Sequence, residues 1–341
     1  MRIPRPRGPV STELLNLMAH WNGPEAGDAA QFESTAEEAV FGTPDILRDG
    51  DLQLALFCLY ELHYSGLEGV DASWEWHPGL IKVRQRLEAS FEDALRSSVS
   101  LPALDQLGSD GVAAALFTMA SADNGPSMSR YIAKKASLEQ LREFLILKSI
   151  YQLKEADPHT WAIPRLNGRA KAAMVEIQAD EYGGGRPERM HSVLFARTMD
   201  GLQMDTRYGA YIDRVPALTL SANNMMSLFG LNRRLRGAIA GHLAAYEMTS
   251  SQPNRLYGNG FRRHGFDEGV TWYFDEHVEA DAVHEQIAGR DLAGGLVEAE
   301  PDLLEDVYFG AAAALAVDVL LATDVMECWE SGVSALLPAG N

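Results

Sequence analysis

Long runs of helical periodicity, with very little strand-like alternation, constrain the fold of this 341-residue chain more than any other feature. Residues three and four positions apart share one face of a helix, whereas a strand repeats every two residues. We therefore expect an all-α protein. The segments with helical periodicity are Asp51–Gly66, Pro78–Arg96, Asp110–Ser121, Ser137–Ala156, Asn167–Tyr182, Pro187–Met199, Asn223–Thr249, Tyr273–Ile287 and Pro301–Gly332.

Several helix ends can be read from single residues. Ser137, followed three residues later by Gln140, predicts a helix start, because a serine side chain accepts hydrogen bonds from the first turn. The run Gly183–Gly185 followed by Pro187 is the strongest helix break in the chain. Proline suits the first turn of the next helix, since its missing N–H has no partner there.

The chain divides by composition into three parts. Residues 1–30 hold several prolines and a mixture of Gly, Ala and Asp from Gly23 to Ala30, which predicts a loosely ordered leader. Residues 31–135 form a helical N-terminal region, and residues 136–341 a second helical bundle. The boundary near Asn124–Ser129 is soft, and one shared core is also compatible with the sequence.

Charge and cysteine content exclude several classes of protein. A net charge of −19 and a pI near 4.8 argue against a nucleic-acid partner, since binding to phosphate backbones needs surplus Lys and Arg. Two cysteines, Cys58 and Cys328, fit a reducing compartment. The longest apolar run, Phe309–Val317, is far shorter than the roughly 20 residues of a membrane span. We expect a cytoplasmic protein with no membrane partner, and a homodimer is compatible with this interpretation.

Three residues near position 280 form the first candidate metal-binding cluster. His277, Asp281 and His284 are offset by four and seven residues, so their side chains lie on one face of a helix. Two imidazoles and a carboxylate in one stripe favour a metal-binding edge. An exposed polar helix with a chance arrangement of these residues is the alternative.

A second cluster contains Glu155, Glu181, Glu188 and His191. On an unbroken helix, the ten residues from Glu181 to His191 would span about 15 Å, too far for one metal site. The glycine-rich break between them allows the chain to turn and bring His191 back toward Glu181. Taken singly, each of these glutamates fits a solvated surface position better than a metal site.

The two clusters together supply three histidines and at least three carboxylates. This number is enough for two irons with positions left open for oxygen. The mixed nitrogen and oxygen donors suit Fe(II) better than structural zinc, which prefers closed tetrahedral sites. Haem fits less well, because the carboxylates would have no role.

These motifs resemble the haem-oxygenase-like di-iron oxidases and oxygenases, also described as iron-containing redox enzymes. The resemblance rests on Leu153–His159, on Glu176–Gly185 leading to His191, and on the His-x₃-Asp-x₂-His motif at 277–284, and covers about residues 140–290. It implies a haem-oxygenase-like helical bundle that binds no haem, here with an N-terminal helical extension. It also implies two Fe(II) per chain, with the ligands Glu155, Glu181, His191, His277, Asp281 and His284.

The resemblance further implies activation of O2 through a peroxo di-iron intermediate. Members of the family hydroxylate amine nitrogens or cleave C–C bonds in amino and fatty acids. We expect a small carboxylate-bearing substrate, an amino acid or a derivative rather than a long-chain fatty acid. Basic residues near the ligand segments, any of which could pair with such a carboxylate, include Lys154, Arg189, Arg262 and Arg263.

Two alternatives stay open on the sequence alone. A ferritin-like di-iron protein would use two carboxylate-x-x-His pairs and two further glutamates. Its ligand set would be Glu155, Glu188, His191, Glu247, Asp281 and His284. A non-catalytic helical interaction protein, whose polar helix faces meet another chain, would bind no stoichiometric iron.

Overall fold

The computed structural model describes residues 1–19, 29–104, 108–122 and 125–339, except for the side chains of residues 279–282. Within these ranges the chain forms helices and no strand, which confirms the predicted all-α fold. Its packing divides into two units. Unit 1 comprises Met1–Ser98, Arg207–Met225 and Leu336–Asn341, and unit 2 comprises Val99–Thr206 and Met226–Ala335. The boundary expected near residue 135 therefore falls inside unit 2.

Unit 1 holds the helices of the N-terminal part of the chain. It contains α1 (Pro9–Ala19), α2 (Ala30–Gly42), η1 (Ile46–Arg48), α3 (Gly50–Glu61), η2 (Ala72–Trp76), α4 (Pro78–Ser97), η6 (Ile212–Arg214) and the first part of α11 (Ala217–Leu231). Helix α1 lies in the segment expected to be a loosely ordered leader. It is ordered because Val10, Leu14 and Met18 form a buried stripe, and because Asp51 accepts hydrogen bonds of 2.7 Å from the Val10 and Ser11 N–H groups. Residues 20–28, which hold most of the expected Gly, Ala and Asp mixture, lie outside the described residues.

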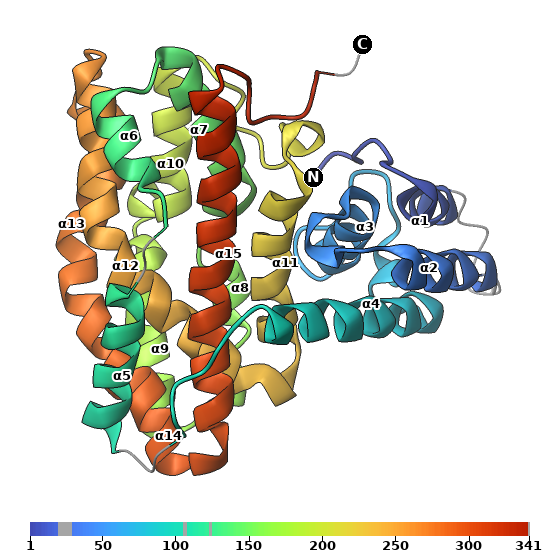
Figure 1. Cartoon of the computed structure of the whole chain (residues 1–341), viewed down its shortest axis with the longest axis horizontal. Coiled ribbons are helices and arrows are strands. Elements are labelled where there is room, and N and C mark those ends of the chain that lie inside the picture. Colours follow the sequence, from blue (N-terminus) through green and yellow to red (C-terminus); the bar gives the residue numbers. More distant parts are fainter. Residues whose placement is uncertain (20–28, 105–107, 123–124, 340–341) are drawn as a thin grey trace. The chain divides into compact units, whose positions relative to one another are not determined.

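Unit 2 carries the long helices. It contains α5 (Ser109–Ser121), α6 (Met128–Lys134), α7 (Leu138–Gln152), α8 (Asp157–Thr160), η3 (Ile163–Arg165), α9 (Gly168–Glu181), η4 (Gly183–Gly185), η5 (Pro187–Arg189), α10 (His191–Gly201), η7 (Arg233–Leu235), α12 (Arg236–Arg263), α13 (Glu268–Gln286), the π-helix η8 (Ile287–Gly294), α14 (Gly295–Ala299), η9 (Pro301–Leu303) and α15 (Leu304–Glu330). Helix α12 packs against both α13 and α15, and these three helices form much of the unit (Figure 1).

Two glycines let the backbones of α12 and α15 touch. A Cβ atom on Gly241 would lie 1.9 Å from the carbonyl oxygen of Val307, and one on Gly310 would lie 1.9 Å from that of Ala238. Any larger residue would force the helices apart. Glu247 lies six residues after Gly241, which places its side chain about 120° around the helix axis from this crossing.

The helix ends match the sequence at some points and differ at others. Ser137 and Gln140 form the predicted cap, since each side chain accepts a hydrogen bond from the other's backbone N–H. The segment predicted as one helix from Asn223 to Thr249 is two helices. Asn232 has an extended backbone between them, and its side chain donates to the Leu228 carbonyl, a local bond that competes with helix continuation.

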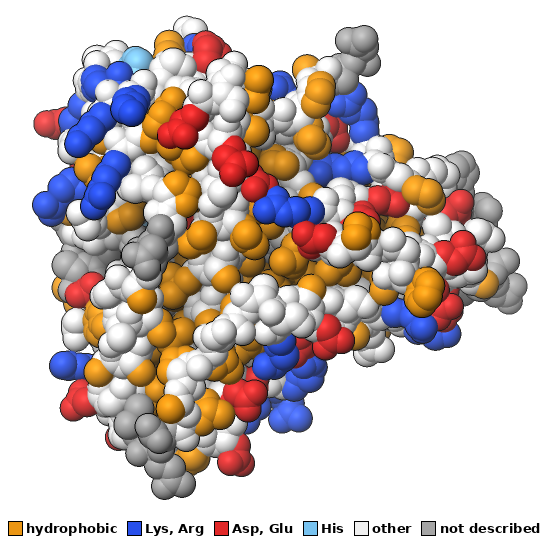
Figure 2. Space-filling view, viewed as in Figure 1, with side chains coloured by type: hydrophobic (Ala, Val, Ile, Leu, Met, Phe, Trp, Pro, Cys, Tyr) orange, Lys and Arg blue, Asp and Glu red, His pale blue; other side chains and the backbone are white. Residues whose placement is uncertain are grey.

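The segment Pro301–Glu330 is long and apolar enough to span a membrane by length and composition, with a mean hydropathy of 1.7 in its most apolar window. Buried core helices pass the same test, and 56% of this window is buried inside the protein. The face in Figure 2 carries hydrophobic side chains along α15. We read this segment as a core helix of unit 2.

Candidate metal centre

Glu155 lies in the turn that follows α7. The next residue, Ala156, has a φ of +77°, a left-handed conformation that residues other than glycine seldom adopt. Glu155 Oε1 accepts a hydrogen bond of 2.8 Å from the Tyr273 hydroxyl and lies 3.5 Å from Nε2 of His277. Helix α13 therefore holds this carboxylate through two of its side chains.

Glu181 and His191 come together across the glycine-rich break. Glu181 is the last residue of α9, and His191 is the first residue of α10. All three glycines of η4 have positive φ, and a Cβ on Gly183 would lie 2.7 Å from the backbone of Arg189, so the chain closes tightly here. Nδ1 of His191 lies 3.0 Å from Oε2 of Glu181. The chain turns back as the sequence indicated.

These side chains form the first of two candidate ligand groups. Ligand atoms of Glu155, Glu181, His191 and His277 all lie within 4.8 Å of one another. The other ring nitrogen of His277, Nδ1, is 2.7 Å from the Tyr273 carbonyl oxygen and donates to it in the matching tautomer. Nε2 is then left to face the centre, as is usual for a metal-binding histidine.

The second group shares Glu181 with the first. Glu181, Glu247 of α12 and His284 of α13 also place one ligand atom each within 4.8 Å of the others. Nδ1 of His284 lies 3.6 Å from Oε2 of Glu247, and its Nε2 lies 3.0 Å from Oδ2 of Asp180. The carboxylate of Glu181 is thus common to both candidate groups.

The electrostatics of the two groups fit cations. Burial raises the pKa of the Glu181 carboxyl, but the surrounding imidazoles outweigh burial and lower this pKa to about 2. Burial lowers the pKa of His284, but Glu247 and Asp180 outweigh it and raise this pKa to about 9. Within the described part of the chain, Glu155 Oε2 and His284 Nδ1 are buried without a hydrogen bond. Buried polar atoms need partners, and a metal ion would supply them.

The structure brings some of the predicted ligands together and leaves others apart. It brings together Glu155, Glu181, His191 and His277, and it places His284 beside Glu181; the side chain of Asp281 lies outside the described residues. Glu188, which belongs to the ferritin-like set, is exposed and in neither group. Glu247, which only that alternative included as a ligand, is buried in the second group. The sequence pointed to Glu247 as a ligand only as one of the two further glutamates that a ferritin-like arrangement adds to the carboxylate-x-x-His pairs.

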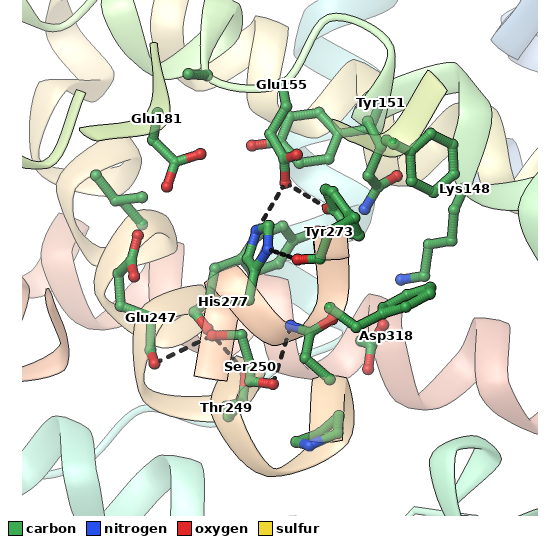
Figure 3. Close-up of a pocket in the computed structure, with 18 of the residues that line it drawn as sticks. Lys148, Tyr151, Glu155, Glu181, Glu247, Thr249, Ser250, Tyr273, His277 and Asp318 are labelled. Atoms are coloured by element: carbon green, nitrogen blue, oxygen red, sulfur yellow. Dashed lines mark hydrogen bonds and ion pairs between the residues drawn. The ribbon is translucent and has the colours of Figure 1, made fainter. Parts of the chain in front are cut away.

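A cavity of about 210 Å³ opens beside these groups (Figure 3). Four candidate ligands, Glu155, Glu181, Glu247 and His277, line it, together with aromatic side chains. Lys148 is the one Lys or Arg among the lining residues in the described part of the chain. The sequence had indicated other basic residues. Arg189 and Arg262 instead form ion pairs with acidic residues of α13, and Arg263 donates to backbone carbonyls near α6.

Two further buried histidines lie next to the cavity but outside both groups. His159 Nε2 is 3.1 Å from His242 Nδ1, so one ring donates to the other. Burial lowers the pKa of His159 to about 4, and burial together with the neighbouring His159 lowers the pKa of His242 well below its usual value. Both imidazoles are therefore neutral at physiological pH and form a hydrogen-bonded pair in the core.

Comparison with known proteins agrees with this geometry. The profile of a family described as "Iron-containing redox enzyme" matches residues 142–319, about half of the chain, and this range includes every residue of the two groups. A nitrosourea synthase from Streptomyces achromogenes subsp. streptozoticus is 26% identical over 187 residues. The aligned part is 55% of this chain and 40% of that relative, so the chain covers less than half of the relative's length.

Proposed function

Because the chain belongs to the iron-containing redox enzyme family, we propose that this oxidoreductase binds two Fe(II) ions and uses O2 to oxidise a small carboxylate-bearing substrate, an amino acid or a derivative. The observation that carries the proposal is the pair of ligand groups that share Glu181. The similarity to a nitrosourea synthase favours oxidation at nitrogen over oxidative C–C cleavage. We also propose a cytoplasmic location, as expected from the sequence.

The residues that would hold the two ions are those of the two groups. Glu155, His191 and His277 would serve one ion, Glu247 and His284 the other, and Glu181 both. Asp281, implied by the family resemblance, is retained as a further ligand on α13. Ferrous ions in this centre would supply the electrons that reduce O2. Addition of one oxygen atom to an amine consumes O2, two electrons and two protons, and releases water, so repeated turnover needs an external reductant such as a reduced flavin.

The protein's own part is to position the substrate and limit access of water. Phe144, Phe195 and Phe274 give the cavity apolar walls next to the candidate ligands. The Tyr273 hydroxyl holds Glu155 in place, and burial, followed by the charge of Glu155, keeps the pKa of Tyr273 well above its usual value. Tyr273 therefore stays protonated and donates this hydrogen bond throughout the physiological range.

Iron counting and oxygen uptake test this proposal. Protein loaded anaerobically with Fe(II) and freed of loose metal should retain close to two irons per chain. Mixing with O2 should give a transient visible absorption band in stopped-flow measurements and oxygen consumption above that of free iron. The Glu181→Ala variant, which removes the shared carboxylate, should lose both properties. Background iron in the parent protein, with oxygen uptake no faster than that of free Fe(II), would rule the proposal out.

A further inference from the structure

Lys148 of α7 is a cation in the wall of the cavity. Its side chain is half-buried, and it makes no hydrogen bond or ion pair with any described residue. A partly buried ammonium group loses hydration, and a carboxylate of a ligand would restore its interactions. The cavity therefore has one position that favours an anionic group.

Asp318 of α15 gives the same cavity one position that favours a cation. Its side chain is exposed, and like Lys148 it has no hydrogen bond or ion pair among the described residues. In Figure 3, Lys148 and Asp318 lie on one side of the cavity, and Glu181 and Glu247 lie on the other, with His277 between. The charges of Lys148 and Asp318 therefore lie across the cavity from Glu181 and Glu247.

On the premise of the proposed function, we propose that Lys148 and Asp318 bind the α-carboxylate and the α-ammonium group of a free amino acid. The side chain of that amino acid then extends toward the candidate metal ligands. A ligand with one negative and one positive group at the same end satisfies both residues, whereas a fatty acid or a simple amine satisfies only one of them.

The size of the cavity agrees with such a ligand. Its volume of about 210 Å³ equals that of about seven water molecules at ~30 Å³ each. A compact amino acid fits a cavity of this size. The group presented to the metal centre is consequently on the side chain, and the α-amino group is held away from it.

Calorimetric titration under anaerobic conditions tests the assignment on the parent protein. The standard amino acids are titrated into iron-free and Fe(II)-loaded protein, and the tightest ligand is compared with its decarboxylated amine and its deaminated acid. Each analogue lacks one charge of the head group, and each should bind roughly ten- to a hundredfold more weakly than the amino acid. Absence of binding by every amino acid, or equal binding of all three compounds, overturns the proposal.

Two variants assign the charges to residues. Lys148→Gln should weaken binding of the amino acid roughly tenfold or more and leave the decarboxylated amine unchanged. Asp318→Asn should weaken it several-fold, because the carboxylate is exposed, and leave the deaminated acid unchanged. Lys135→Gln and Asp302→Asn, which replace exposed residues of unit 2 away from the cavity, are the matched controls and should bind as the parent does. Variants of Lys148 and Asp318 that bind the amino acid normally refute the assignment.

The result is separable from the test of the proposed function. Iron counting needs no amino acid, and the titration of iron-free protein needs neither iron nor O2. Normal iron content and oxygen uptake without any dependence on the head group would leave the proposed function standing and remove this inference. Dependence on both head-group charges in protein that binds no iron would do the opposite.

Discussion

Replacing Glu247 with alanine separates the two ligand groups. Glu247 belongs only to the second group, together with Glu181 and His284. The first group keeps all four of its ligands in this variant. The perturbation therefore removes one carboxylate from one ion and leaves the donors of the other ion intact.

The expected size of the effect follows from the donors that remain. Without Glu247, the described donors of the second group are His284 and the shared Glu181. Even with Asp281, which the proposed function retains as a ligand, the centre would have one carboxylate donor fewer and would hold its second ion less firmly. We expect the retained iron to fall from two to one per chain, and the fast reaction with O2 to be lost, since it needs both ions.

The assay is elemental analysis after anaerobic loading and desalting, followed by stopped-flow mixing with O2. Glu188→Ala is the matched control, because Glu188 is an exposed glutamate three residues before His191 and lies in neither group. This control should keep two irons and normal kinetics. If Glu247→Ala retains two irons, Glu247 is no ligand and the assignment made from the structure is wrong. If Glu188→Ala loses one iron, Glu188 is a ligand, as only the ferritin-like set has it.

Two further predictions concern stability and pH. Gly241→Ala should lower the free energy of unfolding by about 2 kcal/mol or more in urea denaturation, because the new Cβ meets the Val307 carbonyl, although alanine ordinarily stabilises a helix. The control Gly42→Ala, whose Cβ meets nothing within 4 Å, should be neutral or stabilising. Equal effects of the two substitutions would contradict the close crossing of α12 and α15. Affinity for Fe(II) should rise with pH from 6 to 8 by about tenfold per pH unit for each proton displaced. Glu247 outweighs burial and raises the pKa of His284 to about 9, so the imidazole is protonated in this range and the metal must displace its proton. Competition titrations with a chelator measure the affinity, and a pH-independent value would show that His284 is no ligand.

Local spacing was enough to predict one half of the candidate site. His277 and His284 lie on one helix, so the offset of seven residues fixes their common face before any tertiary packing is known. The return of His191 to Glu181 was also readable, because the run of glycines between them admits the left-handed conformations that a tight turn needs. In both cases the geometry is set within about ten residues of chain.

The other half depends on packing between distant elements. Glu247 reaches the centre from α12, whose position depends on the close crossing of Gly241 with α15. No spacing within the sequence encodes that crossing. Lys148 illustrates the same point, since Arg189 is nearer in sequence to a candidate ligand, His191, yet its charge is used in an ion pair with α13. Closeness in sequence did not predict which cation faces the cavity.

Helix α13 contributes side chains to both candidate ligand groups. Its His277 belongs to the first group and its His284 to the second, and its Tyr273 donates a hydrogen bond to Glu155 in the turn after α7. That turn contains Ala156 in a left-handed conformation, which costs on the order of 1–2 kcal/mol. Such strain persists only where the surrounding structure enforces it, and it is concentrated at functional sites. Since Glu155 and Tyr273 also line the cavity, the contacts that position the candidate ligands also shape the cavity in which we propose that the substrate binds.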